Sequence, residues 1–307
     1  MILLCGIPSE RPLAMVGVEL ERLRAEFRFV NQRHVATSAL SWEVSGGEIS
    51  GTLELDGESL DLRSIDGAYI RLMDDRLLPE LQELAEGSPE RRRARGFHEA
   101  LYRWLELAPG RVVNRSGPQG SNSSKPYQAQ LIAASGFLVP ETLITNDPDR
   151  VSEFASGRSA IIYKSTSAIR SIVQEFGDAD RDRLDLIRWC PVQFQERVPG
   201  IDVRVHVVGD EVFPTRIISD VLDYRYARKQ GGNAELEAVD LDDDVAERCV
   251  MLAKRLMLPF VGIDLKITPD GQVYCFEVNP SPAFSYFEAN TGQPIARAVA
   301  RYLAGRQ

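Results

Sequence analysis

Short apolar runs and longer amphipathic stretches alternate at the start of the chain. Residues 2–7 are apolar and end at Pro8, which predicts a buried strand, and residues 13–26 place apolar side chains at helical spacing. Residues 27–30 form a second apolar run. This strand–helix–strand order predicts an α/β lobe with parallel strands.

The pattern then changes to hairpins and to further strands and helices. Residues 41–63 alternate polar and apolar positions around a Gly–Gly and an Asp–Gly pair, which is typical of β-hairpins. The remaining predicted strands are 68–71, 160–164, one beginning at 171, 192–198, 203–208, 211–218, 263–267 and 272–278. The predicted helices are 89–108, 125–135, 241–257 and 293–304, and the basic run that opens the first of them is expected to be a solvated helix face.

Composition and charge argue against several classes of function. The 307 residues carry 36 basic and 45 acidic side chains, a net charge of −9, which argues against a nucleic-acid or membrane-surface binder. The four cysteines lack metal-binding spacing and the three histidines lie far apart, so a zinc site is not expected. The apolar N-terminus lacks a basic flank and is too short to cross a bilayer, so we expect a cytoplasmic protein without a membrane partner.

Oxygen-bearing side chains gather in the closing hairpin. Glu277 and Asn279 alternate along one strand and share a face, whereas Phe276 and Val278 are expected on the other. A turn of two or four residues would place Asp264 of the preceding strand on the same face as Glu277. Three oxygen ligands with room for phosphate and water suit Mg²⁺, and the alternative is a polar hairpin face without an ion.

Two lysines lie where a charge needs a partner. Lys164 ends an apolar strand, and Lys125 stands at a helix N-terminus beside a Ser- and Asn-rich loop. Helix N-termini favour anions, and a lysine adds a point charge for phosphate. Although most lysines are simply solvated, two of them beside a magnesium patch predict a polyphosphate held from several sides.

A strand that turns into a Pro–Gly loop exposes backbone N–H and C=O groups, which can bind the edge of a nucleobase. Gln195 and Glu196 precede this loop, and Asp202 follows it at a position where it could accept from ribose hydroxyls. Arg204 alternates with Asp202, so both can face one cleft. The alternative for Arg204 is an exposed strand residue paired with a neighbouring acid.

In chain order these segments resemble the ATP-grasp superfamily, in particular the RimK-like amino-acid and peptide ligases and the graspetide macrocyclases. The resemblance covers roughly residues 110–290. It rests on an ordered series: Asn114-Arg115, Ser124-Lys125, Ala160 to Lys164, Gln195 to Gly200, Asp202 to Gly209, Asp223-Tyr224-Arg225, Asp264, and Glu277-Val278-Asn279-Pro280. It implies an α/β (α+β) ATP-grasp fold with an N-terminal parallel α/β lobe (1–110), a central lobe (111–195) and a C-terminal lobe with the Mg²⁺ site (196–307), the last two clamping ATP.

The resemblance also implies roles for single residues. Lys125 and Lys164 would contact phosphate, Lys164 also the adenine side, and Gln195 to Val198, with Glu196, would form the adenine hinge. Arg204, Arg216 and Arg225 would lie near the γ-phosphate and the acyl phosphate, and Asp264, Glu277 and Asn279 would bind one or two Mg²⁺ ions. A glycine-rich flap is common after the second lysine, but here Ser165, Thr166 and Ser167 follow and are expected to take its place, which favours peptide-type ligases.

The resulting hypothesis is an ATP- and Mg²⁺-dependent ligase that joins a carboxylate donor to an amine or hydroxyl acceptor, on an amino acid or a peptide. The sequence leaves homo-oligomerisation open. A ligase for free amino acids or dipeptides and a non-catalytic ATP-binding module are the alternatives. Tyr69, Arg71 and Arg76 either face the cleft or, for the arginines, pair on the surface with Asp74 and Asp75.

Overall fold

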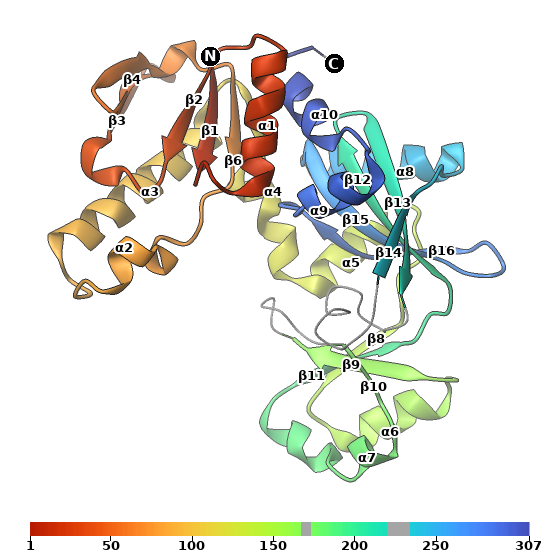
Figure 1. The fold of residues 1–307 in the computed structure, drawn as a ribbon. Coiled ribbons are helices and arrows are strands. Elements are labelled where there is room, and N and C mark those ends of the chain that lie inside the picture. The colour runs from red at the N-terminus through yellow and green to blue at the C-terminus, as the bar shows by residue number, and fades with distance from the viewer. Residues whose placement is uncertain (167–172, 220–233, 307) are drawn as a thin grey trace.

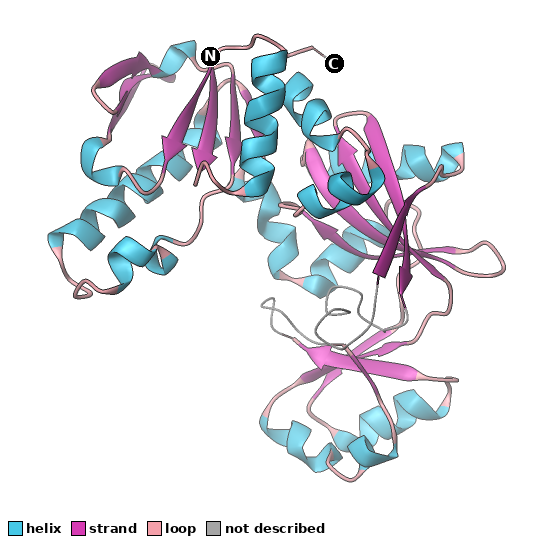
Figure 2. Ribbon diagram, in the orientation of Figure 1, coloured by secondary structure: helices cyan, strands magenta, loops and turns pink. Residues whose placement is uncertain are grey.

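The computed structural model describes residues 1–166, 173–219 and 234–306, and within these ranges the strands form four sheets (Figures 1 and 2). The strand predicted from residue 171 and the predicted site residue Arg225 lie largely or wholly outside the described residues. Single 3₁₀ turns occur at Val35–Thr37, Leu62–Ser64, Asp75–Leu77, Gly120–Ser123 and Leu184–Trp189.

The first sheet is parallel, as the opening pattern predicted. Its order is β2 (Phe27–Asn31), β1 (Ile2–Gly6), β6 (Gly67–Ile70) and β7 (Arg111–Val113). Helix α1 (Arg11–Arg22) connects β1 to β2. It is shorter than the predicted 13–26 because Arg24 adopts a positive φ of 52°, which an α-helix cannot include.

The predicted hairpins form a separate three-stranded sheet. The strands β3 (Ala39–Ser45), β4 (Glu48–Leu55) and β5 (Glu58–Asp61) are antiparallel neighbours. Positive φ angles at Gly46 and Gly47 and at Asp56 and Gly57 provide the tight turns that the sequence predicted. Helices α2 (Pro79–Gln82) and α3 (Pro89–Leu107) complete this part of the molecule.

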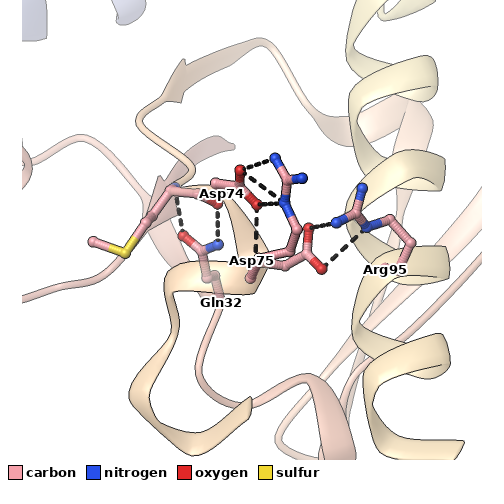
Figure 3. A network of polar contacts seen from close by, with 6 residues as sticks. Gln32, Asp74, Asp75 and Arg95 are labelled. Carbon is pink, nitrogen blue, oxygen red and sulfur yellow. Dashed lines mark hydrogen bonds and ion pairs between the residues drawn. The ribbon is translucent and has the colours of Figure 1, made fainter. Parts of the chain in front are cut away.

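The arginines that open α3 are only in part the solvated face that was predicted: Arg92 and Arg93 are exposed, but the run also binds neighbouring loops. Arg91 donates to the Leu81 carbonyl at 2.7 Å, and Arg93 donates to the Ser38 carbonyl at 2.9 Å. Arg95 pairs with the buried Asp75 at 3.0 Å (Figure 3). These side chains hold the surrounding loops by satisfying carbonyl and carboxylate oxygens.

Two antiparallel sheets make up the rest of the chain. The central sheet has the order β10 (Gln174–Glu175), β9 (Ile161–Ser165), β11 (Val192–Glu196), β8 (Thr142–Thr145), with α6 (Pro148–Ser156) and α7 (Asp178–Arg181) beside it. The C-terminal sheet has the order β14 (Ala234–Ala238), β13 (Glu211–Ser219), β12 (Ile201–Val208), β15 (Phe260–Ile267), β16 (Val273–Asn279). Helices α4 (Ser116–Gln119) and α5 (Lys125–Ala133) lie between the first sheet and these two (Figure 1).

The two faces of the C-terminal sheet pack on different helices. Val203, Val205 and Ile263 belong to a core that includes Leu252 of α8 (Asp243–Arg255). The other face joins a core with α9 (Ser285–Thr291), α10 (Ile295–Leu303) and α1. Because α10 packs against α1 and also contacts β6, β7 and β12, it fastens the first sheet to the C-terminal sheet.

The division of the chain into three lobes, 1–110, 111–195 and 196–307, stays a proposal. The sheets follow this division with two exceptions: β7 completes the first sheet, and β11 crosses the second boundary. None of the helices in the described ranges has the length and apolar character needed to cross a membrane.

Candidate active site

A cleft of about 460 Å³ opens between the central and the C-terminal sheets. Its walls come from β9 and β11 on one side and from β12, β15 and β16 on the other. The lining includes most of the residues predicted to bind nucleotide or metal: Lys125, Lys164, Gln195, Val198, Asp202, Asp264 and Glu277. Segments more than 150 residues apart in the chain thus meet in one place.

Asp264 and Glu277 share a face as predicted, but the turn is longer than expected, because Ile267 pairs with Val273 and leaves five residues between them instead of two or four. Asp264 of β15 lies directly opposite Glu277 of β16, and Gly262 lies opposite Asn279, so the oxygen-bearing side chains share one face. The register then shifts, because Leu265 pairs with Cys275, and Phe276 is the extra residue of a β-bulge. Phe276 therefore lines the cleft beside Glu277, and its predicted orientation toward the opposite face is wrong.

The donor set suits a hard divalent cation. Within the described part of the chain no three His, Cys, Asp or Glu side chains gather as a metal site. A cation here would depend on two carboxylates, Asp264 and Glu277, on the amide oxygen of Asn279, and on phosphate oxygens. Such an all-oxygen, partly open site is what Mg²⁺ uses when it binds a nucleotide.

Side-chain amides hold the strand that carries these donors. Gln128 of α5 both donates to the carbonyl of Val278 and accepts from its amide, each at 2.9 Å. Asn114 accepts from the amide of Phe260 at 3.2 Å and donates to the carbonyl of Pro280. Because Gln128 and Asn114 are buried, these bonds fix β16 and the loop after it.

Arg204 is bound to the acidic face. Its Nη1 donates to Oδ1 of Asp264 at 2.6 Å, and the residue is only 6% exposed. It does pair with a neighbouring acid, but inside the protein, unlike the surface pair considered from the sequence. Buried beside Asp264, it puts a fixed positive charge on the acidic face of the sheet.

Arg216 lies on the other face of the sheet. It is opposite Val203, whereas Arg204 is opposite Thr215, so the two arginines point to different sides of neighbouring strands. Arg216 pairs instead with Glu237 at 3.6 Å, and 43% of its side chain is exposed. The structure therefore does not bring Arg216 together with the other predicted residues.

Gly262 makes room for Arg204. A Cβ at this position would lie 2.3 Å from Nη2 of Arg204 and 2.6 Å from its Cζ, far inside contact distance. The glycine of this strand is needed because the guanidinium lies directly over it.

We therefore expect Gly262→Ala to displace Arg204 and to lower turnover, with a stability cost of about 1–3 kcal/mol from overpacking. Melting temperature and ADP release would measure both effects. Gly96→Ala is the control, because this exposed position in α3 has open space around it and should tolerate or gain from alanine. Unchanged turnover in Gly262→Ala would contradict the assigned packing.

The wall of the cleft opposite the acidic hairpin is built from β9 and β11. Lys164 lies 3.5 Å from Oε1 of Gln195, and Gln195 donates to Thr142 at 2.9 Å. Glu196 accepts from the amide of Glu141 at 2.9 Å, which ties this strand to β8. Of the residues predicted to bind nucleotide or metal, Glu196, Asn279 and the exposed Ser165 are not among those that line the cleft.

The Pro–Gly loop runs close against β15. A Cβ on Gly200, whose φ is +146°, would lie 2.3 Å from the carbonyl oxygen of Ile267, so only glycine fits. Asp202 follows and pairs with Lys266 at 3.1 Å. Sequence reasoning missed Lys266 as a cation of the cleft, although its position two residues after Asp264 placed it on the same face.

His206 is the buried histidine of β12. It is fully buried, its two nitrogens have no hydrogen-bond partner among the described residues, and its ring packs 4.9 Å from that of Phe287. Burial, reinforced by the charge of Arg204, lowers its pKa well below the usual 6.5. The histidine is therefore neutral in the folded protein and serves packing.

Below about pH 6.5, His206 takes up a proton in the unfolded protein but not in the folded one. The free energy of unfolding therefore falls as the pH is lowered, by up to about 1.4 kcal/mol per pH unit. His206→Phe should flatten the dependence of the unfolding free energy on pH between 7 and 5. Denaturant titrations at several pH values would measure this, and an identical slope in the variant would contradict it.

Known proteins resemble this chain in sequence. Residues 123–303 match the model of the RimK-like ATP-grasp domain. A probable alpha-L-glutamate ligase of Xanthomonas euvesicatoria is 28% identical over 225 residues, which cover 67% of this chain and 73% of the relative. The ribosomal protein bS6–L-glutamate ligase of Escherichia coli is 26% identical over 67% of this chain and 72% of its own.

Solved structures resemble nearly the whole chain. The ATP-grasp ligase PsnB, complexed with a phosphomimetic minimal precursor, Mg and ADP, is 27% identical with a TM-score of 0.80 over 99% of this chain and 98% of its own. The macrocyclase MdnC of Microcystis aeruginosa, bound with precursor peptide MdnA, has a TM-score of 0.80 at 22% identity over 99% of each chain. The predicted ATP-grasp fold is confirmed, and the chain belongs to the RimK-like ATP-grasp family of ligases.

Proposed function

We propose that this ligase uses ATP and Mg²⁺ to activate a carboxylate as an acyl phosphate and then joins it to an amine of a peptide substrate. The observation that carries the proposal is the facing pair Asp264 and Glu277 in a cleft that Lys125 and Lys164 also line. The two carboxylates can bind a metal ion and the two lysines can bind phosphate oxygens. Together they can hold a metal–polyphosphate complex that carboxylates alone or lysines alone could not hold.

Each residue has a part in binding ATP. Lys125 and Lys164 hold phosphate oxygens, the backbone from Gln195 to Val198 binds the adenine edge, and Asp202 accepts from the ribose. Asp264, Glu277 and Asn279 would hold Mg²⁺, which reduces the repulsion between the phosphates and an incoming carboxylate when bound.

The reaction then needs positioning more than acid–base chemistry. A carboxylate oxygen attacks the γ-phosphorus, the bond to the β-phosphate oxygen breaks, and ADP leaves. The amine next attacks the acyl carbon, inorganic phosphate departs, and the amine proton passes to solvent. Arg204, fixed against Asp264, offsets the negative charge that gathers on the transferred phosphoryl group.

Two observations favour a peptide over a free amino acid. Ser165, Thr166 and Ser167, the last of them outside the described residues, follow Lys164 in place of the glycine-rich flap that the resemblance led us to expect, and the two similar structures described above contain precursor peptides. Cytoplasmic location and oligomeric state stay predictions.

Mass spectrometry of the products tests the proposal. The protein is incubated with ATP, Mg²⁺ and acidic peptides encoded beside its gene, in parallel with the same peptides plus free glutamate. Loss of one water per bond from a peptide would indicate internal condensation, and a gain in mass would indicate ligation of the amino acid. Binding of Mg-ATP with neither product and no ADP release for any acceptor would overturn the proposal in favour of a binding module.

A further inference from the structure

Arg71 of the first sheet reaches the loop that follows the metal-binding strand. It stands directly after β6, where its amide donates to the carbonyl of Cys5 at 2.8 Å. Gly6 permits this close approach, since a Cβ there would lie 2.7 Å from the carbonyl oxygen of Arg71. The carboxyl ends of β1 and β6 thus present Arg71 toward the C-terminal sheet.

The guanidinium of Arg71 divides its donors between two partners. Nε and Nη2 both bond to Oε1 of Glu10, at 2.8 and 2.5 Å. Nη1 points the other way, to Oγ of Ser281 at 3.2 Å and toward the carbonyl of Pro282 at 3.5 Å. With only 10% of its side chain exposed, Arg71 is an internal connection and not the surface pair considered from the sequence.

The loop after β6 is itself held in place (Figure 3). Gln32 donates to the Met73 carbonyl at 2.6 Å and accepts from the Met73 amide at 2.8 Å, and Arg95 pairs with Asp75. Arg76, in contrast, pairs with Asp74 at the surface, where 73% of its side chain is exposed. The backbone that carries Arg71 is therefore held in place by hydrogen bonds of the loop that follows it.

Ser281 continues the connection to Asn279. The Ser281 amide donates to Oδ1 of Asn279 at 2.9 Å. An amide oxygen has two lone pairs, so this bond orients Oδ1 and leaves one lone pair for a cation. The chain of contacts therefore runs from Glu10 through Arg71 and Ser281 to one of the three oxygen donors.

We propose that Arg71 is a positioning residue for the metal site, through its bond to Ser281 and the orientation of Asn279. The inference rests on the proposed function, since it assumes that Asn279 ligates the cation. Residues behind metal ligands typically change metal affinity by about 10- to 100-fold when they are lost. Arg71 should therefore affect how tightly the metal binds and leave metal-free nucleotide binding unchanged.

The test measures Mn²⁺ affinity by electron paramagnetic resonance in the presence of saturating ADP. Arg71→Gln should weaken Mn²⁺ binding by about tenfold, toward the lower end of the range for such residues. ADP binding in EDTA, measured by calorimetry, should stay the same. Arg76→Gln is the matched control, because it removes an arginine from the same loop without touching Ser281, and should match the wild type.

Ser281→Ala removes the contact from the other side. It leaves the pair of Glu10 and Arg71 intact, so it tests the proposal even where Arg71→Gln fails to fold. It should weaken Mn²⁺ binding in the same direction. Wild-type affinity for Mn²⁺ in both variants, or in Ser281→Ala alone where the other does not fold, would overturn this inference only. A wild-type protein that binds no Mn²⁺–ADP would overturn the proposed function and this inference with it.

Discussion

Replacing Glu277 by alanine should lower ATP-dependent ADP release by about a hundredfold, a loss of roughly 3 kcal/mol of transition-state stabilisation, by analogy with the removal of one electrostatic contact. Glu277 faces Asp264 across β15 and β16, so its loss removes one of two carboxylates that would hold the metal. The fold should persist, because the strand is held by Gln128 and by its neighbours.

A coupled assay of ADP release at saturating Mg²⁺ would measure the effect, with melting temperature as the check on folding. Asp270→Asn is the matched control, since it removes a negative charge from the exposed turn of the same hairpin. Normal turnover of the folded Glu277→Ala variant would show that the metal assignment is wrong.

Arg204→Met should also reduce turnover by about a hundredfold, because it removes a buried charge beside the carboxylates that are proposed to hold the metal. Arg216→Met should stay within about twofold of the wild type, since exposed ion pairs contribute at most about 1 kcal/mol. The contrast follows from the register, which places the two side chains on opposite faces.

The value of kcat/KM for both variants, each checked for folding, would decide this prediction. Arg204→Lys keeps a charge for Asp264 but loses the planar fork, so it should be better folded than the methionine variant and still impaired. Equal losses in the Arg204 and Arg216 variants would contradict the assignment of faces.

Local sequence patterns predicted most helices and strands, whereas irregular features such as the β-bulge at Phe276 were missed. The prediction that Asp264 and Glu277 share a face is right only because the bulge at Phe276, which alternation could not reveal, offsets a turn of five residues in place of two or four. A bulge shifts the in–out alternation by one residue, and this shift is hidden here because the apolar Phe276 fits an apolar cleft wall as well as a core.

Contacts between distant segments were the other limit. Nothing local distinguishes Arg216, which follows a strand pattern much like that of Arg204, because the face of a strand is settled by its neighbours. Likewise, Arg71 and Ser281 are 210 residues apart, and they meet because α10 and the bonds of Asn114 join the first sheet to the C-terminal sheet.

The outer edge of β16 has a consequence for how a peptide can approach. Gln128 satisfies Val278, and the Leu138 backbone bonds to Val273 and Cys275 at 3.2 and 2.8 Å, so the exposed side of this last strand has its polar groups occupied. An extended chain could not be added there as a further strand. A peptide that meets this edge would therefore be recognised by its side chains and not by main-chain pairing.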